Sequence, residues 1–182
     1  IGKGRLADPA DIVAAVDRIL GNGDLEGLRV VVTAGGTREP IDAVRVIANR
    51  SSGKQGHAIT DECVRRGAHV TTITTTELPT PSSVERVQVE TAAQMQNALD
   101  AVVPHADIVI MAAAVADFRP TQAVTEKIKK AGGVPEIVLE PTPDLLEAIG
   151  RNRRDGQTIV GFAAETCDLV TNARSKLERK SL

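Results

Sequence analysis

The segment Asn49-Arg50-Ser51-Ser52-Gly53-Lys54-Gln55-Gly56 decides how this chain folds. It follows a strand-like run at residues 28–33 and a Gly35-Gly36 turn, and it opens an amphipathic helix that we expect to end near Arg66. Serines and glycines at the start of a helix expose backbone N–H groups where the helix dipole is positive, which favours a bound anion, most often phosphate. The spacing matches neither G-x-x-x-x-G-K-[ST] nor G-x-G-x-x-G. An ordinary serine N-cap with a glycine turn remains the alternative.

The composition predicts a soluble domain with an aliphatic core. The chain has 182 residues, of which 42% are hydrophobic and 25% are charged, and this length suits one domain. Trp and Tyr are absent and Phe occurs twice, so no aromatic surface is available for stacking single-stranded nucleic acid. The net charge of −2 provides no basic field for DNA or RNA. We therefore expect no nucleic-acid partner, and no apolar run long enough to cross a membrane.

The cysteines and histidines show no pattern typical of a disulfide, a metal site or a catalytic site. Cys63 falls in a helix pattern and Cys167 follows a strand, so we expect both to be reduced and packed, as in a cytoplasmic protein. His57, His69 and His105 are scattered without metal-ligand spacing. We expect each histidine at the surface or at a helix end.

Strand and helix patterns alternate along the chain, which predicts an α/β fold, a Rossmann-like and mainly parallel sheet with helices on both faces. The strands are expected at 28–33, 69–75, 84–89, 106–112, 137–139 and 158–163. The helices are expected at 52–66, 92–103, 143–151 and 169–180. Gly67 is expected to end the first of these helices, and Thr142 is expected to cap the third. Residues 1–27 are expected to form a linker or docking helix, with Pro9 at its first position and its end near Leu20.

Three loops follow strands and should therefore meet at the carboxyl edge of the sheet, where ligands of such folds bind. They are the loop between residues 33 and 52, which contains Gly35 and Gly36 and which we call the glycine loop, residues 113–120, which we call the alanine loop, and residues 162–166. The small side chains of Ala113 and Ala114 would let a ligand approach the backbone, although they would equally suit packing beneath a helix. Asp117 has two open interpretations, a ligand for a cation or a hydroxyl near a phosphate, and a turn cap.

A cluster of lysines, Lys127-Ile128-Lys129-Lys130, lies in a loop rich in small and polar residues. A cationic loop over the carboxyl edge would neutralise charge during phosphoryl or nucleotidyl transfer. A solvated surface is the plain alternative. Because no catalytic triad, carboxylate pair or cysteine nucleophile stands out, catalysis would depend on positioning and electrostatics.

Five motifs in order resemble the phosphopantothenate–cysteine ligase (CoaB) domain of the bacterial bifunctional coenzyme A biosynthesis protein. They are TAGGTREP at 33–40, RVIANRSSGKQG at 45–56, AAVADFRP at 113–120, KIKK at 127–130 and GFAAET at 161–166. The resemblance covers about residues 28–180, and the sequence GRLADP at 4–9 resembles the junction after the flavin-dependent decarboxylase half. It implies a ligase domain at 28–182 whose pattern continues beyond Leu182, an upstream decarboxylase domain, and no flavin on this chain.

The resemblance also implies the reaction. 4′-Phosphopantothenate attacks the α-phosphate of CTP, which gives an acyl-cytidylate and pyrophosphate, and the amine of L-cysteine then displaces CMP. CTP would be used with Mg²⁺ or Mn²⁺. The preference of the enzyme for CTP over ATP comes from the resemblance alone.

The resemblance also implies a dimer, because family sites form between two protomers. The segment 38–50 is too long and apolar for a simple loop, so we expect Ile41, Val44, Val46 and Ile47 to be buried in a homodimer.

The residues implied to bind the nucleotide are Gly35, Ser51, Gly53, Gly56, Asp117, Lys127 and Phe162. Within this set, Asp117 would hold the divalent cation, Phe162 would pack at the base, and Lys127 would neutralise charge during activation. The residues implied to bind phosphopantothenate or its acyl intermediate are Arg45, Asn49, Ala113 and Ala114. Asn49 and Lys127 are the implied catalytic residues.

Two other function classes remain open. A dinucleotide oxidoreductase would require G-x-G-x-x-G and an acidic residue after the second strand, which instead ends in Thr74-Thr75-Thr76. A non-catalytic assembly domain would keep the fold and bind partners, and turnover distinguishes it from the ligase.

Overall fold

The computed structural model describes residues 9–21, 23–130 and 133–162, together with residues 174, 177 and 180. Residues 1–8, motif residues 163–166, Cys167 and most of the helix predicted at 169–180 lie outside the described residues.

The centre of the molecule is a five-stranded sheet in the order β5-β4-β1-β6-β9, and each neighbouring pair is parallel. Its strands are β1 Arg29–Ala34, β4 His69–Thr74, β5 Glu85–Gln88, β6 Ile108–Met111 and β9 Thr158–Gly161. The predicted Rossmann-like α/β class is confirmed, and these strands begin or end within two residues of the predicted positions.

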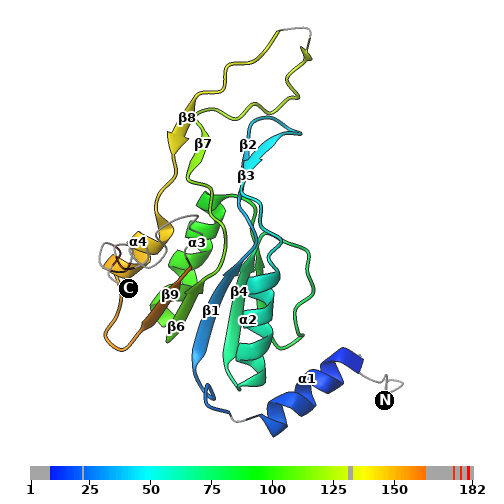
Figure 1. The fold of residues 1–182 in the computed structure, drawn as a ribbon, viewed down its shortest axis with the longest axis vertical. Helices are drawn as coiled ribbons and strands as arrows, with labels where there is room; N and C mark the ends of the chain where they lie inside the picture. Colours follow the sequence, from blue (N-terminus) through cyan, green and yellow to red (C-terminus); the bar gives the residue numbers. More distant parts are fainter. Residues whose placement is uncertain are drawn as a thin grey trace.

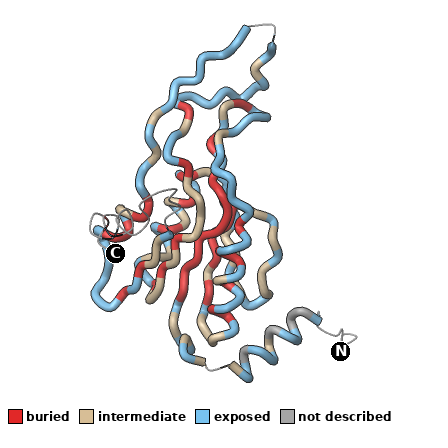
Figure 2. Tube along the Cα trace, viewed as in Figure 1, coloured by how far each residue is buried: buried red, intermediate tan, exposed pale blue. Residues whose placement is uncertain are grey.

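The valines of β1 explain why helices cover both faces of this sheet. Successive side chains of a strand point to opposite faces. Val30 and Val32 pack with Cys63 and Val64 of α2 (Lys54–Arg65) on one face. On the other face, Val31 belongs to a core that includes α3 (Ala92–Val102) and α4 (Leu145–Arg151). Figure 2 shows the buried residues concentrated along these central strands.

The helix ends follow local sequence signals, with one exception. Thr91 and Gln94 form a capping box at the start of α3, and the helix continues into the short 3₁₀ helix η1 (Val103–His105). The predicted Thr142 cap of α4 is wrong. Asp144 is the N-cap, because its side chain accepts a hydrogen bond from the Glu147 backbone N–H at 3.0 Å.

Two antiparallel strand pairs project beyond the carboxyl edge of the sheet (Figure 1). One pair is β2 (Arg38–Pro40) with β3 (Val46–Ala48), and the other is β7 (Phe118–Pro120) with β8 (Leu139–Pro141). The short strand predicted at 137–139 therefore lies two residues later, in β8. We call residues 38–48, 118–130 and 133–141 the arm.

Helix α1 (Pro9–Leu20) lies at the opposite end of the molecule from the arm and contacts α2 (Figure 1). It begins at Pro9 and ends at Leu20, as predicted. Ile19 and Leu20 on this helix are exposed. Within the described residues, no helix is long and apolar enough to cross a membrane.

Candidate active site

The glycine loop leaves the start of α2 without a side-chain cap. Gly53 is the N-cap residue, with a left-handed φ of 74° that favours glycine, and it makes no capping bond. Ser51 and Ser52 are exposed, and their hydroxyls accept long contacts of 3.4 Å from the backbone of Gly53 and Lys54. The alternative of an ordinary serine N-cap is therefore wrong, and the positive end of the α2 dipole faces the loop.

Gly56 has a packing role that the sequence did not reveal. It is buried where α2 crosses the end of β1. A Cβ atom added there would lie 2.6 Å from the Cβ of Ala34 and 2.8 Å from the carbonyl oxygen of Thr33. Gly56 thus allows α2 to approach β1 closely enough to bring the glycine loop to the carboxyl edge.

Hydrogen bonds join the alanine loop to the end of β1. The backbone N–H of Ala113 donates to Thr33 Oγ1 at 3.0 Å, and that of Ala114 donates to the Gly35 carbonyl at 2.8 Å. The N–H of Ala116 donates to the hydroxyl of Thr37 at 2.9 Å. The loops after β1 and β6 are therefore one connected unit, as the convergence of strand ends predicted.

Asn49 joins the glycine loop to this unit and borders a cavity of about 590 Å³. Its side-chain amide donates to the Val115 carbonyl at 3.0 Å. Five of the predicted site residues line the cavity: Asn49, Ala113, Ala114, Asp117 and Phe162. Cavity residues that sequence reasoning missed include Arg50, Thr142, Asp144 and Lys180. Of these, Thr142 donates its hydroxyl to the Ala116 carbonyl, which ties it to the alanine loop.

The charged groups of the cavity suit a nucleotide that brings its own cation. Asp117 is exposed there, whereas Asp144 pairs with the buried ammonium group of Lys180 at 2.7 Å. The described residues contain no cluster of three or more His, Cys, Asp or Glu side chains that would hold a metal by themselves. Mg²⁺ usually binds through one or two carboxylates plus substrate phosphates, so the single carboxylate of Asp117 fits a metal–nucleotide complex.

Six predicted residues do not line this cavity. Gly35 follows β1, and Ser51, Gly53 and Gly56 lie at or near the start of α2. The other two are Arg45 and Lys127. Arg45 is at the tip of the β2–β3 pair, and Lys127 is exposed in the loop between β7 and β8, so both belong to the arm. Arg45 lines a separate, mainly apolar hollow of about 320 Å³ together with Lys129 and Lys130. The structure does not bring the lysine cluster over the glycine loop of the same chain.

Asp42 was not predicted to have a functional or structural role. The sequence signal that would have identified it is an Asp-x-x-Arg pattern in a tight turn. Its side chain is fully buried, and its Oδ1 accepts hydrogen bonds from the backbone of Val44 and Arg45, both at 2.8 Å. Its Oδ2 accepts from Arg45 Nη1 at 2.5 Å and from the Ile128 backbone N–H at 3.1 Å. Burial opposes ionisation, but these backbone donors and the Arg45 charge outweigh it and lower the pKa of Asp42 to about 2.

His57 lies in the first turn of α2, so it is at a helix end as one form of the prediction had it, but its side chain is buried. His69 and His105 are exposed, as predicted. The Nε2 atom of His57 lies 3.2 Å from Thr74 Oγ1 and 3.0 Å from Thr76 Oγ1. Burial, assisted by the charge of Arg86, lowers the pKa of His57 below its ordinary value.

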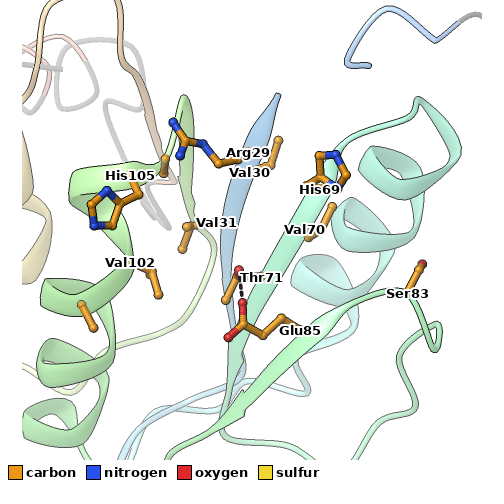
Figure 3. Close-up of a pocket in the computed structure, with 12 residues that line it drawn as sticks. Arg29, Val30, Val31, His69, Val70, Thr71, Ser83, Glu85, Val102 and His105 are labelled. Carbon is orange, nitrogen blue, oxygen red and sulfur yellow. Dashed lines mark hydrogen bonds between the residues drawn. The ribbon is translucent and has the colours of Figure 1, made fainter. Parts of the chain in front are cut away.

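A second hollow lies at the opposite, amino edge of the strands (Figure 3). It has a volume of about 420 Å³ and is bordered by Arg29 and His69 at strand starts, and by His105. In Figure 3 the Thr71 hydroxyl donates to Glu85 Oε2, at 3.1 Å. Because ligands of parallel sheets bind at the carboxyl edge, we place the candidate site in the cavity beside Asn49.

Residues 25–182 match the family described as DNA/pantothenate metabolism flavoprotein C-terminal domain. Proteins named coenzyme A biosynthesis bifunctional protein CoaBC are 47% identical to this chain in Mycobacterium bovis, over 98% of the chain, and 44% identical in Escherichia coli, over its whole length. The chain spans about half the length of these curated relatives, 47% and 46% respectively.

Two solved structures show the same fold. The C-terminal domain of a CoaBC protein superposes with a TM-score of 0.76 and 41% identity, covering 88% of this chain and 76% of that one. A Cab2 mutant in complex with phosphopantothenate-cysteine superposes with a TM-score of 0.68 and 18% identity, covering 98% of this chain and 78% of that one. At that low identity, the second comparison bears on the fold alone.

Proposed function

The chain belongs to the DNA/pantothenate metabolism flavoprotein C-terminal domain family, and from this premise we propose that it is the ligase part of a cytoplasmic enzyme of coenzyme A biosynthesis. The proposed ligase domain is residues 28–182, and residues 1–27 would connect it to a flavin-dependent decarboxylase domain. The names of the CoaBC relatives support a role in coenzyme A biosynthesis, and the five motifs that resemble the phosphopantothenate–cysteine ligase domain support a product made of phosphopantothenate and cysteine.

The proposed reaction has two displacements. A carboxylate oxygen of 4′-phosphopantothenate bonds to the α-phosphorus of CTP, and the bond to the β-phosphate breaks to release pyrophosphate. The amine of L-cysteine then bonds to the acyl carbon and loses a proton, and CMP leaves with the electrons of the broken bond. The product is 4′-phospho-N-pantothenoylcysteine.

One observation carries this proposal: hydrogen bonds join the glycine loop, residues 113–116 and Thr142 around one cavity, and the glycine loop leads into a helix start without a side-chain cap. The bond from Asn49 to Val115 closes this arrangement at 3.0 Å. A rigid pocket that combines backbone N–H donors with small side chains suits a reaction driven by positioning and electrostatics.

The proposed site residues form two groups, one that would bind the nucleotide and one that would bind phosphopantothenate. We assign the triphosphate to Gly35, which follows β1, and to Ser51 and Gly53 at the start of α2, where the helix dipole favours anions. Phe162 would pack against the base. Gly56 would act by holding α2 against β1. Asp117 would hold Mg²⁺ or Mn²⁺ together with the phosphates, and the cation would offset charge that develops on the pyrophosphate.

The pantothenate end would lie in the cavity lined by Asn49, Ala113 and Ala114. Asn49 can both donate to and accept from an acyl-cytidylate, because its side chain is an amide. Ala113 and Ala114 leave room for the chain of the substrate beside their backbone.

The arm supports a homodimer with shared sites. Its exposed apolar side chains are Val44, Val46, Phe118, Val124, Val134, Ile137, Val138 and Leu139. Such a patch on a projecting element favours burial against a second copy. Because Lys127 and Arg45 lie on this arm and away from their own cavity, we propose that they serve the site of the partner.

Pyrophosphate release tests the function directly. The intact protein is incubated with Mg²⁺ and either CTP or ATP, with and without phosphopantothenate and L-cysteine. We expect pyrophosphate only when phosphopantothenate is present, CMP release only after L-cysteine is added, and faster turnover with CTP. Nucleotide binding without pyrophosphate release would contradict the proposal and favour the non-catalytic assembly domain.

A further inference from the structure

The lysine segment, residues 127–130, is tied to the β2–β3 pair at Ile128. Its backbone N–H donates to Asp42 Oδ2 at 3.1 Å, and its carbonyl accepts from Arg45 Nη1 at 3.4 Å. Asp42 and Ile128 are 86 positions apart in the sequence, so this contact exists only in the folded arm. A nearby backbone bond, from Val124 to Ile41 at 3.1 Å, joins the same two parts of the arm.

The two oxygens of Asp42 have separate tasks. Oδ1 accepts from Val44 and Arg45 and closes the local turn, whereas Oδ2 accepts from Ile128 and the Arg45 guanidinium. A buried carboxylate is costly unless donors surround it, and here four donors do. Hydrogen bonds to an ionised group are also stronger than neutral ones, so the Oδ2 contacts make a firm connection.

We propose that Asp42 is a positioning residue that fixes the lysine segment on the arm and thereby aims Lys127 at the reacting phosphates. The inference rests on the proposed function, because it assigns Asp42 to the first step of that reaction. Lys127 and Lys129 flank Ile128 and are exposed, so their side chains would otherwise sample many directions. Holding the backbone between them restricts where each ammonium group can reach, and small displacements of a catalytic group are costly.

The substitution Asp42→Asn separates the two tasks. The asparagine side chain is able to keep its carbonyl oxygen toward Val44 and Arg45, so the turn survives. Its NH₂ group then replaces Oδ2 and faces the Ile128 N–H and the Arg45 guanidinium, which are both donors. The connection to the lysine segment is lost while the turn remains. A matched control is Glu140→Gln, which removes the 2.8 Å ion pair with Arg119 elsewhere on the arm.

Two measurements on the intact protein test the inference. Hydrogen exchange followed by mass spectrometry reports on peptides that contain residues 127–130 and 42–47. Steady-state pyrophosphate release in the presence of L-cysteine, at varied CTP and phosphopantothenate, separates kcat from KM. For Asp42→Asn we expect faster exchange in the 127–130 peptide and unchanged exchange in the 42–47 peptide. We also expect kcat for pyrophosphate release to fall roughly 10- to 100-fold, with little change in KM. The Glu140→Gln control should match the unaltered protein in both measurements.

Several outcomes would overturn the inference. Unchanged exchange at residues 127–130 in Asp42→Asn would show that Asp42 does not hold the segment. Faster exchange with an unchanged kcat would show that holding it has no catalytic consequence. Faster exchange at residues 42–47 as well would show a general structural role. Absence of pyrophosphate release from the unaltered protein would overturn the proposed function, while the exchange measurement would still decide whether Asp42 anchors the segment.

Discussion

The side-chain amide of Asn49 donates to the main-chain carbonyl of Val115 at 3.0 Å, which connects the loop before α2 to the loop after β6. This bond crosses 66 positions of sequence and closes the wall of the cavity. Asn49 therefore has a structural partner on one side and faces the candidate site on the other.

Asn49→Asp should slow the second step more than the first. A carboxylate cannot donate to Val115 and would repel the phosphate of an acyl-cytidylate, so the intermediate would be held poorly when cysteine attacks. Quenched-flow analysis with labelled CTP separates the intermediate from CMP. The matched control is Asn152→Asp, outside the cavity, where the amide donates to Ala148 at 3.0 Å. Equal slowing of both steps would instead indicate a structural turn asparagine.

Lys127→Gln should mainly slow formation of the acyl-cytidylate. A cation matched to developing phosphate charge acts in the transition state, and its loss should cost about 2–4 kcal/mol, the range for one preorganised electrostatic donor. Pyrophosphate release in a single turnover is the measurement, with Lys130→Gln as the neighbouring control. A normal rate of intermediate formation in Lys127→Gln would contradict this role and indicate that the lysine cluster is only a solvated surface.

Val44→Asp should weaken the homodimer. Val44 lies at the tip of the β2–β3 pair with 65% of its surface exposed, and a buried carboxylate in an apolar interface is costly. Sedimentation at high micromolar concentration should show a dimer for the unaltered protein and a shift towards monomer for the variant. Ile19→Asp on α1, which replaces another exposed apolar residue, should leave the dimer intact. A fully active monomer of the unaltered protein would rule out shared sites.

Gly56→Ala should destabilise the fold by about 1–3 kcal/mol, the usual cost of overpacking. The added methyl group would meet Ala34 and the Thr33 carbonyl at 2.6 and 2.8 Å. Urea unfolding measures the change, and Gln55→Ala on the exposed side of the same helix is the control. If Gly56→Ala were as stable as Gln55→Ala, α2 would not depend on close contact with β1.

His57 should make the folded state less stable in mild acid. Its pKa is lowered in the folded protein, so below the ordinary value of 6.5 the unfolded chain binds a proton that the folded chain does not. Stability is therefore complete above about pH 6.5 and falls as the pH drops towards the lowered value. Urea unfolding at pH 7.5 and 5.5 should show a smaller pH dependence in His57→Gln than in the unaltered protein. The exposed His69→Gln variant should keep the original dependence, and an identical dependence in both variants would contradict the assignment.

The sequence by itself determined the order of the five central strands and of the helices between them, because local signals specify them, but it did not reveal β2, β3 and β7 of the arm. Continuous valines in Arg29–Ala34 predict a strand buried on both faces, and glycine at 67 ends α2 as expected. The alternation of these elements was sufficient to predict the parallel sheet, and the rule that ligands bind at the carboxyl edge placed Asn49, Ala113 and Asp117 in one site.

Only the tertiary structure decided which residues hold the site together. The contact of Gly56 with Ala34, the burial of His57 and the bond from Asp42 to Ile128 each join segments that no local pattern connects. The cap of α4 was mispredicted for a related reason, since Thr142 and Asp144 both suit an N-cap and the distant Ala116 carbonyl takes the threonine hydroxyl. Local propensity depends on neighbours in sequence, whereas these contacts depend on how the sheet and the arm bring remote backbone groups within hydrogen-bonding distance.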